Sequence, residues 1–424
     1  ANDDVHAIAF QSFAGDPDDP ADVGEQKILV GGDFTAYNTV AKNRIVRINS
    51  DGSLDQSFNV GTGADDFVSS ILVRRQGEIL LGGGFTSFNG TVRYSVAQLN
   101  SDGSLDISFD PGQGANAPVR AMAFQLDESL LLAGEFTEYD NEPRMHLVRV
   151  DDKGVIDSTL DIEDGGPNAP IYALAVQRLG QQTEDEKILI GGDFTEIGNY
   201  RRGRLARLNL DGTLDTTFET VQGANGTIHS IDVRWWDGKI IIAGSFTSIN
   251  LVPRNGIARL NSDGSLDTSF DPGSGVDSPI YSVLIDDGMG AIWDPNRRGK
   301  IYIGGLFTEY NGTRRMGVAR LFSDGTLDTS WMDTAYNQFA GLHKSAVSDP
   351  PLHVRDLGVN STGDLLIGGS FERVGGGFTR DDIRNQSNIT RLKGGATQGP
   401  GNIQLVEDHY SVDENTGELF VLLE

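Results

Sequence analysis

The sequence contains no cysteine, and this absence excludes several kinds of chemistry at once. Without thiols the chain has no disulfide bonds, thiolate metal sites or cysteine nucleophiles. It also lacks any run of 18 apolar residues, so no segment has the composition of a membrane-spanning helix. Basic residues are scarce, because 34 Lys and Arg stand against 61 Asp and Glu, for a net charge of −27. A surface this acidic repels phosphate groups, which makes nucleic acids and anionic membranes poor partners.

The sequence also lacks the short motifs that mark common enzyme sites. Its six histidines are scattered without an H-x-H or H-E-x-x-H pattern, which argues against a zinc site. No G-x-S-x-G elbow, P-loop or dinucleotide-binding fingerprint occurs. We therefore expect no catalytic residues and a function that is not enzymatic.

A short repeated unit decides the fold. Its first copy, Lys27–Thr35, reads KILVGGDFT, which is an apolar run followed by a glycine pair and an aromatic residue. The run is typical of a buried strand, and the glycine pair permits a bulge or a close backbone approach. Seven copies occur, with aromatic residues at Phe34, Phe85, Phe136, Phe194, Phe246, Phe307 and Phe371.

Each repeat contains four strand-like segments. The first is rich in small residues, as in Val119–Phe124, which suits a crowded inner strand. The second is the apolar run. The third alternates apolar and polar residues, as in Arg44–Asn49, and the fourth follows an Asp-Gly turn, as in Ser53–Phe58. In six repeats the motif Phe and the polar residue of the third segment are 13 residues apart.

A unit of this size cannot bury both of its faces alone, so the units must stack on one another. The sequence therefore predicts an all-β fold, a seven-bladed β-propeller of four-stranded antiparallel blades over residues 1–395. The seventh repeat has no fourth segment after Ile389–Leu392. This predicts a three-stranded last blade, whose open outer edge offers a site for self-assembly by β-augmentation.

Residues 188–195 (ILIGGDFT) and 256–273 (GIARLNSDGSLDTSFDPG) resemble the delta-60 repeat of bacterial proteins. The resemblance implies a propeller module of a large secreted or cell-surface protein. It implies no particular activity.

The C-terminal stretch differs from the repeats. Residues 396–402 have the composition of a linker, and residues 403–424 read as the first strands of a β-sandwich. The segment Tyr410–Gly417 (YSVDENTG) resembles the opening of a Calx-beta domain. Because a sandwich needs roughly 100 residues, we expect the natural chain to continue beyond Glu424. In that family a glutamate at the position of Glu414 binds Ca²⁺, which makes Glu414 a candidate ligand.

Two insertions break the repeat in neighbouring units. The connection from Trp331 to Val354 is 23 residues long, and the connection from Phe371 to Arg391 is 20 residues long. Long loops that carry aromatic and charged residues are frequent recognition surfaces, although they also serve only to cover a seam. The predicted patch for a protein or glycan partner comprises Trp331, Tyr336, Phe339, His343, Lys344, Arg373, Phe378, Arg380, Asp381 and Asp382.

Aspartates are the remaining candidates for chemistry. Those that recur before the turn glycines and in the fourth segments are interpreted as structural, because such side chains bond to nearby backbone. The densest cluster, in the loop around Pro17, is a candidate Ca²⁺ site, although a solvated acidic loop explains it as well. Its predicted ligands are Asp16, Asp18, Asp19 and Asp22.

These observations predict a non-catalytic propeller module of an extracellular or cell-surface bacterial protein. Its expected role is adhesion, protein or glycan interaction, or surface assembly, with Ca²⁺ as the candidate cofactor. The alternative is a carbohydrate-active propeller enzyme or a glycan-binding lectin that uses the loops of the sixth and seventh repeats.

Overall fold

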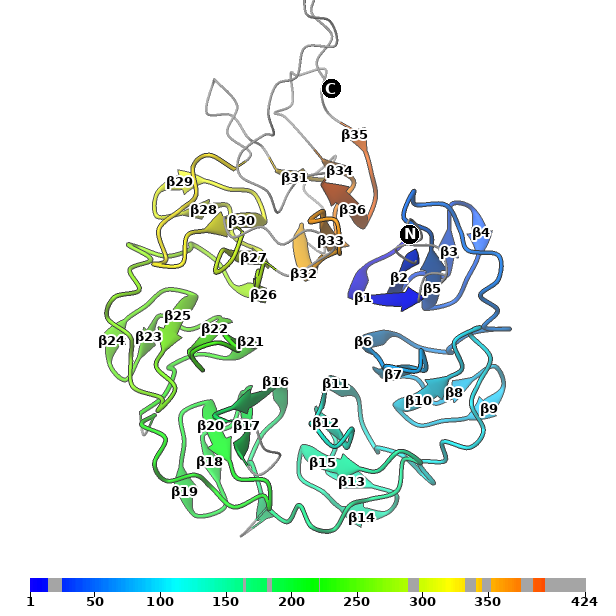
Figure 1. Cartoon of the computed structure of the whole chain (residues 1–424), viewed down its shortest axis with the longest axis horizontal. Coiled ribbons are helices and arrows are strands. Elements are labelled where there is room, and N and C mark those ends of the chain that lie inside the picture. The colour runs from blue at the N-terminus through cyan, green and yellow to red at the C-terminus, as the bar shows by residue number, and fades with distance from the viewer. Residues whose placement is uncertain are drawn as a thin grey trace, which may run out of the picture.

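The computed structural model describes residues 1–13, 25–162, 165–180, 185–220, 222–288, 297–331, 341–344, 352–374 and 384–392. The linker and the C-terminal β-sandwich predicted from the sequence lie outside this part of the chain. The described residues contain seven antiparallel sheets of three strands that surround a central axis (Figure 1). The all-β, propeller-like architecture predicted from the repeats is confirmed.

The inner strand of each sheet carries the small-residue segment. Each inner strand packs against the next around the axis, and β32 packs against β1, which closes the ring. The inner strands are β1 (Val5–Phe13), β6 (Val68–Val73), β11 (Val119–Phe124), β16 (Ile171–Arg178), β21 (Ile228–Val233), β26 (Ile280–Ile285) and β32 (His353–Val359).

The repeated motif forms the middle strand of each sheet, and the alternating segment forms its outer neighbour. The middle strands are β2 (Glu25–Gly32), β7 (Ile79–Gly83), β12 (Leu130–Gly134), β17 (Glu186–Gly192), β22 (Ile240–Gly244), β27 (Ile301–Gly305) and β33 (Leu365–Ser370). The outer strands are β5 (Ile45–Ile48), β10 (Val96–Leu99), β15 (Leu147–Val150), β20 (Leu205–Leu208), β25 (Ile257–Leu260), β30 (Val318–Leu321) and β36 (Ile389–Leu392).

The predicted fourth strand requires a correction. In the first repeat it shrinks to one antiparallel bridge, Ile48 to Leu54, and the five following repeats have an equivalent bridge. The cause is the next residue. The Asp55 carboxylate accepts hydrogen bonds from the backbone N–H of Ser57, at 3.0 Å, and from its hydroxyl, at 2.7 Å. These local bonds bend the chain away from the outer strand after a single pair.

Short hairpins after the motif Phe were not predicted. They bury one side chain each, such as Tyr139, against the sheet. The hairpin strands are β3 (Ala36–Tyr37) and β4 (Val40–Ala41), β8 (Ser87–Phe88) and β9 (Thr91–Val92), β13 (Glu138–Tyr139) and β14 (Glu142–Pro143), β18 (Glu196–Ile197) and β19 (Tyr200–Arg201), β23 (Ser248–Ile249) and β24 (Val252–Pro253), and β28 (Glu309–Tyr310) and β29 (Thr313–Arg314).

In the last two repeats an extra sheet replaces the seventh hairpin. Strand β34 (Arg373–Val374) lies between β31 (Leu342–His343) and β35 (Arg384–Asn385). Because β31 comes from the first insertion and β35 from the second, the prediction that the two insertions lie side by side is confirmed.

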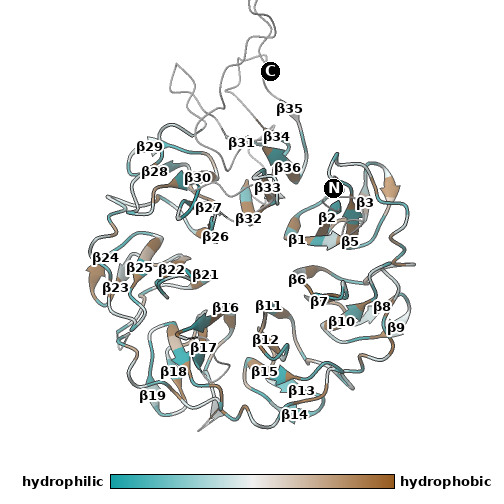
Figure 2. Cartoon of the chain, viewed as in Figure 1, coloured by the Kyte–Doolittle hydropathy of each residue, from teal (hydrophilic) through white to brown (hydrophobic). Residues whose placement is uncertain are grey.

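The core consists of apolar layers between neighbouring sheets. Figure 2 shows apolar residues on the strands of each sheet. In one layer Leu29 and Ile45 of the first sheet pack with Ile71 and Leu81 of the second. No sheet therefore has a complete core of its own, as expected for a repeat fold.

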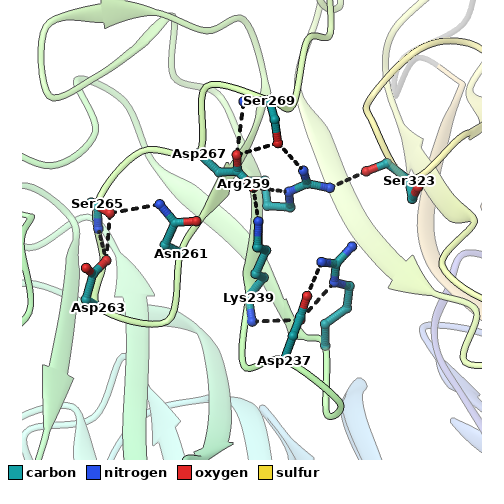
Figure 3. A network of polar contacts seen from close by, with 10 residues as sticks. Asp237, Lys239, Arg259, Asn261, Asp263, Ser265, Asp267, Ser269 and Ser323 are labelled. Atoms are coloured by element: carbon teal, nitrogen blue, oxygen red, sulfur yellow. Dashed lines mark hydrogen bonds and ion pairs between the residues drawn. The ribbon is translucent and has the colours of Figure 1, made fainter.

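Buried polar clamps join neighbouring sheets, and Figure 3 shows the clamp of the fifth sheet. In the fifth sheet Nε of Arg259 lies 2.7 Å from Oδ2 of Asp267, and Nζ of Lys239 lies 2.6 Å from the same oxygen. The guanidinium also donates to the carbonyl of Ser323 in the next sheet. Burial alone raises the pKa of Asp267, but hydrogen bonds from Lys239, Ser269 and Arg259 outweigh it and lower that pKa. The structural interpretation of the repeated aspartates is thereby confirmed.

Candidate binding site at the axial mouth

A bulge at the start of each inner strand shapes the mouth of the central channel. In the first sheet Val5 pairs with Gly32 and Ala7 pairs with Gly31, so that His6 is the extra residue. The other six sheets have the same register shift. The close approach and bulge predicted from the glycine pair are confirmed, with the bulge on the strand opposite the glycines.

The second glycine of each pair makes this bulge possible. A Cβ on Gly83 would lie 2.1 Å from the carbonyl oxygen of Phe67, which stands just before β6, the inner strand of the same sheet. The corresponding distance at the other six second glycines is 2.0 to 2.3 Å. Backbone cannot move aside as a side chain can, so only glycine fits. The first position is less restricted, and Ala133 and Ala243 occupy it in two repeats.

The bulged residues bring one side chain from every sheet to the mouth. All seven are half-buried and line cavities at the axis. They are His6, Ser69, Arg120, Tyr172, His229, Tyr281 and Arg355. The larger of two cavities there, of about 390 Å³, is also lined by Glu135, Asp193 and Thr227. A second cavity that shares these bulged residues, of about 210 Å³, also contacts Asp356.

Several of these side chains are held by the residue that follows a glycine pair. Nε2 of His6 lies 2.7 Å from Oδ2 of Asp33, and the hydrogen bond lowers the pKa of that carboxyl. Nε of Arg120 donates to Glu135 at 2.8 Å. The mouth therefore presents fixed charges of both signs on a protein whose overall charge is strongly negative.

Aromatic rings fill the spaces between the charges. The guanidinium of Arg355 lies 4.6 Å from the ring centre of Tyr281, and the imidazole of His229 meets the same ring edge-on at 5.1 Å. Arg120 covers Phe67 at 4.8 Å. Burial lowers the pKa of His229 to about 4, so its imidazole is neutral at neutral pH. Among the bulged residues, Arg120 and Arg355 therefore supply fixed positive charge.

Two aspartates on the inner strands have a structural role. The carboxylate of Asp356 accepts the backbone N–H of Ile8 at 2.7 Å, and that of Asp232 accepts the N–H of Ile285 at 2.6 Å. Each bond joins one inner strand to its neighbour. Burial raises the pKa of both carboxyls to about 7, despite these hydrogen bonds.

The raised pKa predicts an unusual pH dependence at Asp232. In the unfolded chain an aspartate loses its proton near pH 3.9, whereas folded Asp232 keeps it until about pH 7. The stability that the protonated group confers is complete below the unfolded pKa and is lost as the pH rises through 7. An Asp232→Asn variant cannot ionise. Its melting temperature, relative to wild type, should therefore rise between about pH 5 and about pH 8. A difference that did not change with pH would mean that folded Asp232 is already charged at pH 5.

The structure places four of the ten predicted patch residues. Trp331 is 2% exposed and packs edge-on against Tyr302 at 5.7 Å, and His343 is 6% exposed. Their assignment to an exposed patch is corrected, because Trp331 fills the core position that Phe270 occupies one repeat earlier. Backbone pairing places His343 opposite Arg373, and Lys344 and Arg373 are half-buried. Tyr336, Phe339, Phe378, Arg380, Asp381 and Asp382 lie outside the described residues.

The predicted Ca²⁺ ligands Asp16, Asp18, Asp19, Asp22 and Glu414 also lie outside the described residues. Within the part of the chain that the structure describes, no three His, Asp or Glu side chains are grouped as a metal site requires.

The sequence contained one signal for the mouth that was missed. In each inner segment the position after the first apolar residue changes freely, from His to Ser, Arg and Tyr, while its neighbours stay small or apolar. A variable polar position inside an otherwise uniform repeat indicates a surface that the repeat does not need for its own packing.

Comparison with known proteins agrees with this architecture. Six segments match a family model described as a domain of unknown function (DUF5122) beta-propeller, at residues 27–58, 77–109, 125–160, 183–218, 237–270 and 299–330. Six of the seven repeats therefore match this repeat model. This is the delta-60 repeat family, so the resemblance noted in the sequence is confirmed for these segments. A search of the curated proteins gave no match.

Solved structures support the fold alone. The WD40 β-propeller domain of Doa1 is similar with a TM-score of 0.52 and 14% identity, over 92% of each chain. The extracellular domains of the two-component systems BT3049 and BT4673 from B. thetaiotaomicron give TM-scores of 0.47 and 0.46 at 14% and 16% identity. The alignments cover 89% and 79% of this chain but only 39% and 34% of those proteins. Among the described residues, no helix has the length and apolar character to cross a bilayer.

Proposed function

We propose that this chain is a non-catalytic, seven-bladed β-propeller module of a large extracellular or cell-surface bacterial protein, and that it binds a saccharide at its axial mouth. The observation that carries the proposal is the ring of bulged residues. Each sheet contributes one half-buried side chain to the mouth, and these side chains differ while the surrounding repeat does not. The similarity to delta-60 repeats supports the extracellular location, and adhesion is the role that we propose for the module.

The chemistry of the mouth favours a saccharide. Sugar rings pack their apolar faces on aromatic side chains, and their hydroxyl groups need fixed donors and acceptors. Tyr172 and Tyr281 supply rings, Arg120 and Arg355 supply donors, and Asp193 supplies an acceptor around one cavity of about 390 Å³. That volume falls within the range of small-molecule sites in proteins.

A glycoside hydrolase would need two carboxyl groups free to exchange protons with the substrate or to attack it. Glu135 and Asp193 both line the mouth, but each is already engaged. Glu135 forms an ion pair with Arg120 at 2.6 Å, and Asp193 accepts the hydroxyl of Thr227. We therefore propose recognition without hydrolysis, which predicts that a bound glycan is recovered intact.

Substitution of Tyr281 or Arg355 by alanine should weaken glycan binding roughly tenfold or more, because each removes a contact from the centre of the site. A glycan array would identify the ligand, and isothermal titration with wild-type protein and both variants would measure the loss. Tyr200→Ala is the matched control, since Tyr200 is an exposed tyrosine on the outer hairpin β18–β19. Equal affinity of wild type and the three variants would mean that the glycan does not bind at the mouth.

The loops of the sixth and seventh repeats extend this proposal. Strand β31 precedes the inner strand β32, and β34 follows the middle strand β33. A large ligand held at the mouth would therefore also contact Lys344 and Arg373 in the β31–β34–β35 sheet. The Ca²⁺ ligands, the Calx-beta domain and self-assembly at an open blade edge likewise remain proposals.

A further inference from the structure

A cavity at the seam between the last and first sheets is a seventh copy of a pocket that is filled elsewhere in the ring. In the first, second, fourth and fifth sheets the Phe that ends the Asp-x-Ser/Thr-Phe segment covers the turn glycine of the next sheet, and in the third the backbone of Asp161 lies closest to that glycine. A Cβ on Gly103 would lie 2.8 Å from Phe58, and one on Gly264 would lie 2.7 Å from Phe218. The same relation joins Phe270 to Gly325 at 3.0 Å.

Backbone hydrogen bonds complete each filled pocket. The residue after the aromatic donates its N–H to the carbonyl of the residue before the turn glycine. Asn59 donates to Asp102 at 2.7 Å, and Asp271 donates to Asp324 at 2.7 Å. The segment therefore adds a short extended piece of chain to the edge of its neighbour.

At the seam between the last and first sheets, the first sheet has the same turn, with its glycine at Gly52. Among the described residues, no atom lies within 4 Å of a Cβ on Gly52, although Gly103 and Gly264 are covered at the same turn. Next to Gly52 is a cavity of about 350 Å³, lined by apolar and polar residues of both sheets. Its lining includes Ile28, Tyr37 and Ile48 of the first sheet and Leu366, Ile389 and Arg391 of the last.

Arg391 occupies the clamp position of the seventh sheet. Its guanidinium donates to the carbonyl of Ser50, as the Arg259 guanidinium does to that of Ser323. In the other arginine clamps an aspartate eight residues later accepts from Nε, but here that position is Gly399. Asp364 approaches Nε of Arg391 only to 3.8 Å, compared with 2.7 Å between Arg259 and Asp267. A carboxylate supplied from elsewhere would complete the clamp.

We propose that the seam cavity binds an extended segment of sequence Leu-Asp-x-Ser/Thr-Phe that lies outside residues 1–424, with its Phe over Gly52 and its Asp on Arg391. This goes beyond the proposed saccharide site, which lies at the axis. Six segments of this chain have the signature or a close variant, and each pairs within its own sheet through an isolated bridge. In residues 393–424 the only aspartates, Asp408 and Asp413, are followed three residues later by Ser411 and Thr416 rather than by an aromatic.

Peptide binding in trans tests the proposal directly. A fluorescein-labelled peptide with the sequence of Ser265–Asp271 (SLDTSFD) is titrated with the whole chain, and fluorescence anisotropy is recorded. Saturable binding is expected, and a peptide with Phe270→Ala or Asp267→Asn should bind roughly tenfold more weakly or worse. These controls change only the peptide, so they cannot fail because the protein does not fold.

The cavity side of the contact is tested with Arg391→Ala. This variant should bind the native peptide more weakly than wild type does, and its affinities for the native and Asp267→Asn peptides should differ less. Arg201→Ala, on the exposed hairpin β18–β19, is the matched control and should bind as wild type does. Absence of saturable binding would overturn the proposal. Equal affinity for the three peptides, or binding that is unchanged by Arg391→Ala, would overturn it too.

Discussion

Asp328→Ala is expected to lower the free energy of unfolding by about 3–5 kcal/mol, because it leaves two cations buried without their counter-charge. Nε of Arg320 and Nζ of Lys300 each lie 2.9 Å from Oδ2 of Asp328. The side chains of Arg320 and Asp328 are fully buried, and that of Lys300 is 9% exposed. Neither cation can reach water without opening the contact between sheets.

The second repeat supplies a matched control, because it carries the same clamp with a neutral donor. There Nε2 of Gln98 donates to Asp106 at 2.8 Å, in place of an arginine. Asp106→Ala removes the bond from Gln98 and two local bonds from Ser108, as Asp328→Ala does at Ser330, but it strands no charge, so it should cost less, about 1–2 kcal/mol. Urea unfolding followed by circular dichroism would compare the two variants. Equal losses would mean that the clamps act only as hydrogen bonds.

The fold could be predicted because its determinants are local and repeated. Each copy of the motif indicates a strand that ends where two backbone segments approach closely. The fixed spacing from Phe34 to Arg47 indicates where the next strand lies. Seven copies of such a unit can bury their apolar faces only on each other, which implies a ring. The architecture therefore follows from periodicity without knowledge of any single contact.

Two predicted details were wrong, the fourth strand and the exposure of Trp331. The first depends on competition between local hydrogen bonds and strand pairing. Ser53–Phe58 has the composition of a strand, yet Asp55 bonds Ser57 and ends the pairing after Leu54. Trp331 was assigned to a recognition patch because it precedes an insertion. Its spacing after Asp328 is the same as that of Phe270 after Asp267, which already indicated a core residue.

The axial mouth could not be predicted for a different reason. Its residues share a position in the repeat but no chemical type, so no motif joins His6 to Tyr281 or Arg355. Only the closure of the ring brings these residues to one cavity. The glycine pair indicated a bulge, but it did not indicate that the extra residue belongs to the opposite strand and lines the axis.

Gly83→Ala tests whether this bulge depends on the glycine pair, and it should cost about 3 kcal/mol or more because the added methyl group collides with backbone. The Cβ would lie 2.1 Å from the carbonyl oxygen of Phe67, and that oxygen already accepts the N–H of Gly84 at 3.0 Å. Relief requires the start of β6 to move, which would displace Ser69 at the mouth.

Gly82→Ala is the control for Gly83→Ala, because the two substitutions add the same atom one residue apart. At Gly82 the new Cβ would lie 2.8 Å from Cγ1 of Val119, a side-chain atom that can shift, and Ala133 and Ala243 occupy this position in other repeats. Its cost should stay below about 1.5 kcal/mol. Thermal and urea unfolding of both variants would measure the difference. If Gly83→Ala were as mild as Gly82→Ala, the backbone at the mouth would be free to move, and the second glycine would not be what fixes the ring of bulged residues in place.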